Sequence, residues 1–201
     1  MKVLAFNTTT MNASIVLLVG EKRYYQKLET FAKHSESLMT SISQVLEKAS
    51  IKVSDLDFIA ISVGPGSFTG IRLSLAILKA FMTANTNIKA VELNTLELMK
   101  RCYNSDENLA FVMNALSGKY FVLTNDEPFL SYDINEISQK KIGLLEEGLL
   151  FVDDNVELDD DVMMDIAIEK IVKGEVYDDL NPLYLRNSQA EENLSANRKN
   201  D

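Results

Sequence analysis

Short apolar runs and stretches of helical periodicity alternate along the first half of the chain. Apolar and β-branched runs between turn residues predict strands, and apolar residues that recur at helical spacing predict helices with one buried face. The continuous apolar run 58–63 is typical of a strand covered on both faces. The predicted elements, in order, are strands over 2–7, 13–19 and 23–29, a helix over 35–49, a strand over 58–63, a helix over 68–84, a strand over 89–93 and a helix capped by Asn94.

The second half carries weaker patterns. Strands are predicted over 109–114 and 119–124, and a helix over 163–173 with Asp159–Asp161 as an acidic start that favours its dipole. The intervening stretch is dominated by polar and acidic residues. We therefore expect an α/β protein in which a mixed sheet carries helices on its faces. The expected divisions are an N-terminal lobe over 1–105, a smaller C-terminal lobe over 106–187 and a disordered tail over 188–201.

Composition narrows the function classes. With 30 acidic and 20 basic residues, the net charge of -10 repels phosphate backbones, so any contact with RNA is expected to be indirect. One histidine and one cysteine do not make a zinc site of the usual ligand types. No apolar run approaches the roughly 20 residues of a membrane span, and the N-terminus lacks the pattern of a signal peptide. We expect a cytoplasmic protein without a membrane contact.

A glycine-rich segment, GPGSFTG, lies between a buried strand and a helix. Such a turn lets backbone amides at a helix N-terminus face an anion, which makes it a candidate phosphate or nucleotide contact. The alternative is a tight turn without a ligand, because the P-loop and dinucleotide fingerprints are both missing. The candidate anion-proximal residues are Gly64, Gly66, Ser67 and Gly70.

The two central helices favour a docking surface. Opposite its apolar stripe, the helix over 35–49 carries small polar residues where a solvated surface usually has Lys and Glu. The helix over 68–84 is apolar nearly all round, with small residues Gly70, Ser74, Ala76 and Ala80 that let another helix approach. The alternative is that this helix is buried between its own sheet and the first helix. The candidate interface residues are Ser37, Leu38, Thr40, Ser41, Gln44, Ile71, Arg72, Leu75, Leu78, Lys79 and Met82.

Several longer segments carry a family resemblance. VGPGSFTGIRLSLAILKAF, with DLDFIAIS before it and VELNTLELM after it, resembles the TsaB (YeaZ) family, as do LAFNTTTMNASIVLL and NPLYLRN. The resemblance is close from residue 2 to about residue 124 and returns over 160–187. It implies an actin-like (ASKHA) fold of two ribonuclease-H-like lobes, the second one reduced. It also implies a non-catalytic subunit of the bacterial tRNA threonylcarbamoyladenosine machinery.

The resemblance implies particular partners. The two central helices would bind the catalytic subunit TsaD, or a second copy of the chain when it is alone, and the ATPase TsaE would join the complex. The chain would thereby support threonylcarbamoyl transfer to the tRNA adenosine adjacent to the anticodon. Arg72 would be a polar contact at the interface, or alternatively a contact to a nucleotide phosphate. We expect no cofactor, and weak nucleotide binding at the partner interface stays open.

Departures from the catalytic members of the superfamily disfavour chemistry by this chain. Asn7 stands where the family's first-strand aspartate would be, and Asn114 stands where many TsaB sequences have aspartate before Ala115. An amide is a poorer ligand for Mg²⁺ than a carboxylate. In TsaD, the corresponding helix carries a pair of metal-binding histidines. In this chain the helix that begins after Asn94 has no histidine. His34 is expected to have a local role at the start of a helix, and Cys102 to be a packed thiol. We therefore expect no catalytic residue and no metal; the alternatives are a stand-alone ATPase or kinase and, more remotely, a glycoprotease-like peptidase.

Overall fold

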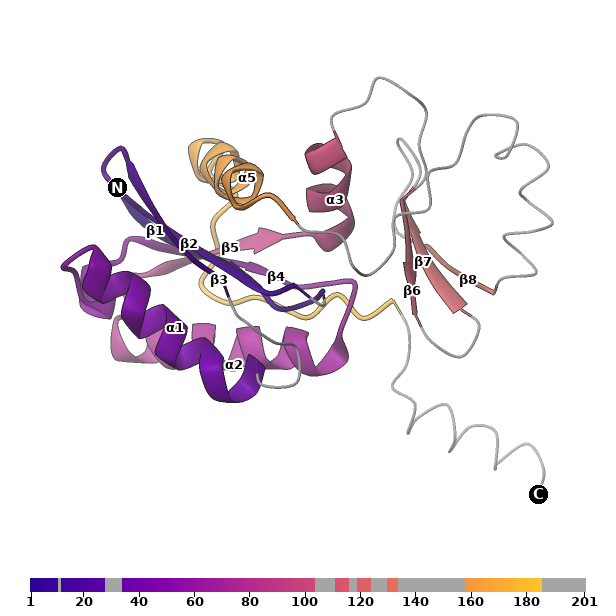
Figure 1. Ribbon diagram of the computed structural model, residues 1–201, viewed down its shortest axis with the longest axis horizontal. Helices are drawn as coiled ribbons and strands as arrows, with labels where there is room; N and C mark the ends of the chain where they lie inside the picture. The colour runs from indigo at the N-terminus through magenta and orange to yellow at the C-terminus, as the bar shows by residue number, and fades with distance from the viewer. Residues whose placement is uncertain are drawn as a thin grey trace.

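Two β-sheets organise the part of the chain that the computed structural model describes (Figure 1). The larger sheet has the strand order β3-β2-β1-β4-β5, and the smaller has the order β6-β7-β8. The described residues are 1–10, 12–27, 34–103, 111–115, 119–123, 130–133 and 158–185. The strands are β1 (Lys2–Asn7), β2 (Ser14–Val19), β3 (Lys22–Lys27), β4 (Phe58–Ser62), β5 (Lys89–Leu93), β6 (Phe111–Asn114), β7 (Lys119–Leu123) and β8 (Leu130–Asp133).

The pairing confirms the predicted order of the first half. β1, β2 and β3 form an antiparallel meander, and β4 and β5 continue the sheet from β1 as parallel strands. Asn7 pairs with Ser14, which places the loop after β1 at the same end of the sheet as the carboxyl ends of β4 and β5. That end of the sheet therefore gathers the loop after β1 and the glycine-rich turn after β4.

Helices cover both faces of the larger sheet. α1 (His34–Lys48) and α2 (Phe68–Ala84) lie on one face, and α3 (Thr95–Tyr103) and α5 (Asp160–Val172) lie on the other (Figure 1). A short 3-10 helix, η2 (Val53–Asp55), precedes β4. Alternation along β1 explains the two cores: Leu4 and Phe6 pack towards α1 and α2, whereas Val3 and Ala5 pack towards α3 and α5. None of the described helices is long and apolar enough to cross a membrane.

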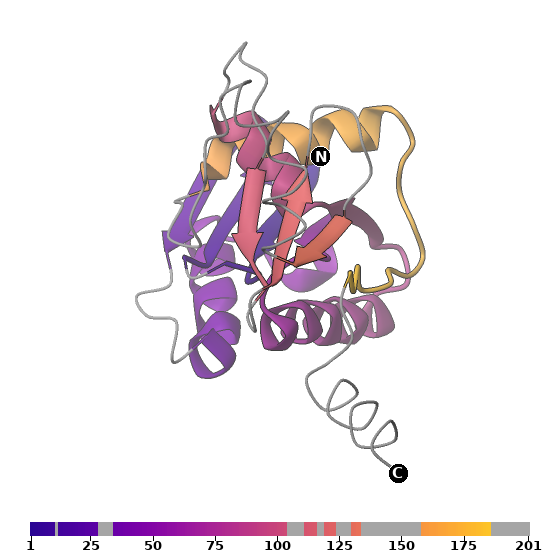
Figure 2. The ribbon, with the colours of Figure 1, turned by 90° about the vertical axis from the view of Figure 1, so that its right-hand side faces the viewer.

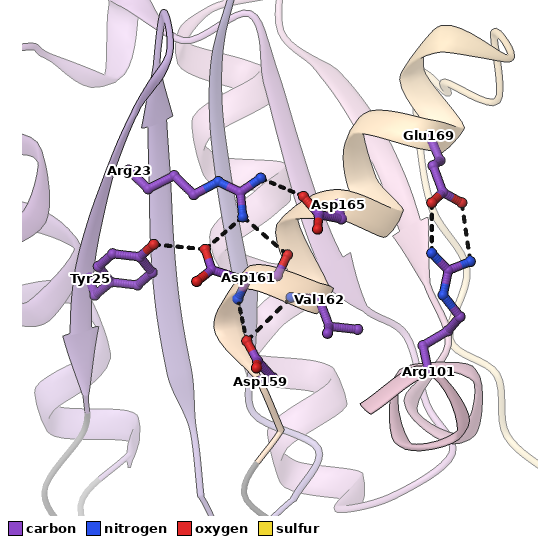
Figure 3. Close-up of polar contacts among 8 residues, drawn as sticks. All are labelled: Arg23, Tyr25, Arg101, Asp159, Asp161, Val162, Asp165 and Glu169. Atoms are coloured by element: carbon purple, nitrogen blue, oxygen red, sulfur yellow. Dashed lines mark hydrogen bonds and ion pairs between the residues drawn. The ribbon is translucent and has the colours of Figure 1, made fainter. Parts of the chain in front are cut away.

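Polar contacts fasten α5 to the edge strand β3 (Figure 3). The Arg23 guanidinium binds the Asp161 carboxylate at 2.6 Å and also contacts Asp165, while the Tyr25 hydroxyl donates to Asp161 at 2.7 Å. The hydrogen bonds from Arg23 and then Tyr25 hold the pKa of Asp161 below its usual value. Asp159 caps the helix by accepting from the amides of Asp161 and Val162. The acidic residues thus begin α5, as predicted, and also anchor it.

The C-terminal part of the described chain returns to the first sheet. Beyond α5, Tyr177 pairs with Ala90 on the free edge of β5, and the amide of Leu183 donates to the carbonyl of Val63 at 2.9 Å. Figure 2 shows this segment running from α5 towards α2. The apolar side chains of residues 158–185 complete the two cores that flank the larger sheet, and one of these cores also contains Phe111, Met113 and Phe121 of the smaller sheet. The division into lobes over 1–105 and 106–187 stays a prediction. The predicted tail over 188–201 lies outside the described residues.

Candidate functional site

The loop after β1 and the turn after β4 are bonded directly to each other. The Ser67 amide donates to the Thr9 carbonyl at 2.8 Å, and the Thr95 amide donates to the Gly64 carbonyl at 2.9 Å. The Ser67 hydroxyl caps α2 by accepting from the Gly70 amide at 3.1 Å. The start of α2 is thus held by the chain's own carbonyl and hydroxyl oxygens.

The glycines in this turn are explained by close backbone approach. A Cβ at Gly70 would collide with the Thr8 carbonyl oxygen, and a Cβ at Gly66 would collide with the Thr9 carbonyl oxygen. Gly66 also has a φ of 150°, which other residues rarely adopt. Because two carbonyl oxygens lie against the turn, the geometry favours the turn without a ligand. Anion contact by Gly64, Gly66, Ser67 and Gly70 stays a prediction.

Threonine side chains complete a buried polar network between β1, α2 and α3. Thr8 donates its hydroxyl proton to the Gly70 carbonyl at 2.7 Å, and its oxygen lies 2.6 Å from the Ser74 hydroxyl oxygen. The Thr9 and Thr95 hydroxyl oxygens are 2.7 Å apart. This role of the threonines was not predicted, although their position directly after the first strand was a usable signal. The network fixes the start of α2 relative to the sheet.

Asn7 uses both ends of its side-chain amide within the same loop. Its oxygen accepts from the Thr9 amide at 3.1 Å and the Thr9 hydroxyl at 2.6 Å, and its nitrogen donates to Thr10 at 2.8 Å. Asn114 ends β6 and His34 begins α1; the structure describes the backbone of these two residues and not their side chains. Within the described ranges, no three His, Cys, Asp or Glu side chains come together as a metal-binding group. Asn7 acts here as a loop-stabilising residue.

Cys102 is half-buried on α3. Its sulfur accepts a hydrogen bond from the Asp159 amide at 3.3 Å, and burial raises the pKa of its thiol. A raised pKa leaves less of the reactive thiolate at neutral pH. These observations agree with the predicted packing role.

The outer face of α1 is small, polar and partly apolar. Thr40, Ser43 and Gln44 are exposed, and Ser37 is half-buried, as expected for the predicted docking face. Ser41 is buried, and Leu38 is in the core. Neither side chain is exposed for contact with a partner, so these two interface predictions are wrong. Met39 also lies on this outer face, with 44% of its surface exposed.

The orientation of α2 corrects further interface predictions. Ile71, Leu75 and Leu78 point into the core shared with α1, because positions three and four apart fall on one side of a helix. Gly70 and Ser74 contact Thr8 instead of leaving space for another helix. Met82 is half-buried. The exposed residues of α2 are Thr69, Arg72, Ala76, Lys79, Ala80, Thr83 and Ala84.

Both basic residues on this outer face contact the C-terminal segment. The Arg72 guanidinium carbon lies 3.9 Å from the Phe68 ring centroid, and Arg72 Nε donates to the Tyr184 hydroxyl at 3.2 Å. The Phe68 and Tyr184 rings stack with centroids 4.7 Å apart. Lys79 pairs with Asp179 at 3.4 Å. Tyr184 was missed as a site residue, because it lies far from α2 in the sequence.

Comparisons with known proteins agree on one group of relatives. The family model described as TsaD, tRNA N6-adenosine threonylcarbamoyltransferase, matches residues 28–124. Two proteins of Buchnera aphidicola, from the subspecies Baizongia pistaciae and Schizaphis graminum, are named tRNA threonylcarbamoyladenosine biosynthesis protein TsaB. They are 31% and 29% identical to this chain over 97 residues, or 48% of it. The matches cover 44% and 46% of those two relatives, so the compared region is less than half of each.

Solved structures show the same architecture. A Pseudomonas aeruginosa protein described as similar to peptidase YeaZ aligns with a TM-score of 0.76 at 17% identity, covering 92% of this chain and 99% of that chain. YeaZ from Pseudomonas aeruginosa aligns with a TM-score of 0.70 at 18% identity, covering 88% and 96%. At these identities the likeness shows the fold alone, and it confirms the expected actin-like α/β fold.

Proposed function

We propose that this chain, which is similar to TsaB proteins over 48% of its length, is a non-catalytic TsaB-type subunit that binds a TsaD-type partner through the outer faces of α1 and α2. Binding would support threonylcarbamoyl transfer to the tRNA adenosine adjacent to the anticodon. The partner would carry out the chemistry and contact the tRNA. TsaE would join the assembled complex, and a second copy of the chain would occupy the same face when TsaD is absent.

One observation supports this proposal above the others: two adjacent helices lie on the same side of the sheet (Figure 1), and most of the side chains that they expose are small or uncharged. Ala76 and Ala80 lie one helical turn apart on α2, and neither hinders the approach of another helix. On α1, Met39 offers an exposed apolar side chain beside Thr40 and Ser43. A surface of this kind suits helix–helix packing with a partner better than it suits open solvent.

The non-catalytic role is supported by the way the strand ends are occupied. The side-chain amide of Asn7 is hydrogen-bonded to Thr9 and Thr10, and the Thr9 carbonyl lies against the glycine turn. A nucleotide phosphate at this place would meet carbonyl oxygens, which repel its charge. The residues at the end of β1 therefore stabilise a loop and offer no carboxylate to a metal.

The proposal is tested by reconstituting the reaction with purified components. TsaD from the same organism, the threonylcarbamoyl-adenylate donor, TsaE and tRNA are incubated with or without this chain, and modified adenosine is quantified. The expected result is that modification requires both TsaD and this chain. Modification of equal rate and extent without this chain would refute the proposed role.

A second assay addresses the two rival functions. The chain alone is incubated with ATP and Mg²⁺, and separately with a glycoprotein, and no turnover above the buffer control is expected. Gly66→Glu serves as the matched variant, because it disrupts the turn at the start of α2. ATP hydrolysis by the wild type that Gly66→Glu abolishes would favour a stand-alone ATPase or kinase. Glycoprotein cleavage by the chain alone would favour a peptidase.

A further inference from the structure

We propose that Phe68, Arg72 and Tyr184 form a receptor for a carboxylate of the partner protein, in which Tyr184 positions the Arg72 guanidinium. This inference rests on the proposed function, because it specifies the partner's chemistry at the same helix face. It also makes the C-terminal segment part of the docking surface. Tyr184 is a positioning residue in this scheme, and Arg72 makes the contact.

The guanidinium is oriented from two sides before any partner arrives. Phe68 lies beneath it, with 3.9 Å between the guanidinium carbon and the ring centroid, and Tyr184 accepts a hydrogen bond from Nε at 3.2 Å. Tyr184 is itself held by its stack on Phe68 and by its neighbour Leu183, whose amide binds the Val63 carbonyl. A guanidinium held in this way loses little further conformational freedom when it binds an anion.

The remaining donors of Arg72 suit a carboxylate. Arg23 and Arg101 are each bound to carboxylates of this chain, whereas no carboxylate within the described residues lies in ion-pair range of Arg72. With Nε committed to Tyr184, the two terminal nitrogens are left as a planar pair of donors. That pair matches the two oxygens of a carboxylate.

The surrounding charge also favours an acidic partner surface. α2 contains no acidic residue, although the whole chain has a net charge of -10. Its two basic residues, Arg72 and Lys79, are seven positions apart and both exposed, so they lie on the same side of the helix two turns apart. Lys79 forms an ion pair with Asp179. Arg72 is therefore the principal positive charge on this helix for an incoming carboxylate.

A protein carboxylate fits this place better than a nucleotide phosphate. The turn that would cradle a phosphate at the start of α2 lies against the Thr8 and Thr9 carbonyl oxygens. Arg72 is exposed on the outer side of the helix, beside the Ala76 and Ala80 surface that another helix would cover. The carboxylate is therefore expected on a helix or loop of the protein that docks there.

The test is calorimetric titration of TsaD from the same organism with wild type and single variants at low and high salt. Arg72→Gln is expected to raise the Kd about tenfold and to make it less dependent on salt. Arg72→Lys keeps the positive charge but loses the planar pair of donors, so its Kd is expected between those of wild type and Arg72→Gln. Tyr184→Phe keeps the ring stack, and we expect a Kd about threefold higher with an unchanged Tm. Arg101→Gln, on the opposite face of the sheet, is the control and should leave the Kd unchanged.

The outcomes separate this inference from the proposed function. Wild type that binds TsaD with the same Kd and salt dependence as Arg72→Gln and Tyr184→Phe would overturn the receptor and leave the proposed function standing. Wild type that does not bind TsaD would overturn both. Binding of ATP or inorganic phosphate to wild type in the absence of TsaD, abolished by Arg72→Gln, would show that Arg72 belongs to a phosphate site and would overturn the carboxylate receptor. Loss of self-association with an unchanged Kd for TsaD would assign Arg72 to a second copy of the chain, against the receptor.

Discussion

The carbonyl oxygen of Thr9 accepts a hydrogen bond from the amide of Ser67 at 2.8 Å, which ties the loop after the first strand to the start of α2. A short loop and a glycine turn that are 58 residues apart in the sequence thereby form one structural unit. Because α2 carries much of the proposed docking face, the unit that fixes its first turn also fixes that face relative to the sheet.

Gly70→Ala tests the close approach in this unit. Alanine is a better helix former than glycine by about 1 kcal/mol, so an exposed site would be stabilised. Here the new methyl group would collide with the Thr8 carbonyl oxygen, and we expect the free energy of unfolding to fall by more than about 2 kcal/mol. Denaturant unfolding gives the value. Ala76→Gly, at an exposed position of the same helix, is the control and gives the alanine–glycine difference without a collision. Unchanged or increased stability in Gly70→Ala would contradict the described contact.

Ser62→Ala compares two buried hydroxyls with different surroundings. Ser62 and Ser74 are both fully buried, but the Ser62 hydroxyl has no hydrogen-bond partner among the described residues, whereas the Ser74 hydroxyl contacts Thr8. Removing an unpaired buried hydroxyl should raise the free energy of unfolding by up to about 1 kcal/mol, and Ser74→Ala should lower it by about 1 to 2 kcal/mol. The pair is measured by urea unfolding. A loss of stability in Ser62→Ala as large as that in Ser74→Ala would mean that the Ser62 hydroxyl is satisfied.

The contacts between β3 and α5 predict a loss of stability in acid (Figure 3). The pKa of Asp161 is lowered by Arg23 and then Tyr25, so its stabilising effect is present above the ordinary value of 3.8 and is lost as the pH falls through the lower folded-state pKa. Because Asp161 is half exposed, the effect is expected to be at most about 1 kcal/mol. Asp161→Asn should therefore flatten the decline in stability measured between neutral pH and about pH 3. Tyr25→Phe should flatten it less, since it removes only the second hydrogen bond. An identical acid profile in wild type and Asp161→Asn would exclude this linkage.

The first half of the fold could be predicted because local patterns and tertiary structure agree there. The run 58–63 was recognised as doubly covered, and Phe58–Ser62 is indeed flanked by β1 and β5 and buried on both faces. The helix over 68–84 has the predicted bounds, since Ser67 caps it and the turn glycines precede it. Strong periodicity and clear turn residues fixed these elements.

The docking face was predicted less accurately, because the rotation of a helix about its axis depends on its neighbours. Nearly every position of α2 could have faced the sheet, and the contact between Gly70 and Thr8 decides which side does. Leu75 and Leu78 consequently face inwards, and Ala76 and Ala80 outwards. The contact between Tyr184 and Arg72 spans residues 112 positions apart and leaves no local signal in the sequence.

The most direct test of the proposed function is the affinity of this chain for TsaD when the outer face of α2 is changed without disturbing the core. Ala76→Arg places a long charged side chain on that face, and Val172→Arg does the same on α5, across the sheet, where Val172 is 79% exposed. Calorimetry should show binding by wild type and Val172→Arg with the same Kd, and a Kd at least about tenfold higher for Ala76→Arg at an unchanged Tm. Equal binding by Ala76→Arg and wild type, or no binding by wild type, would contradict docking through this face.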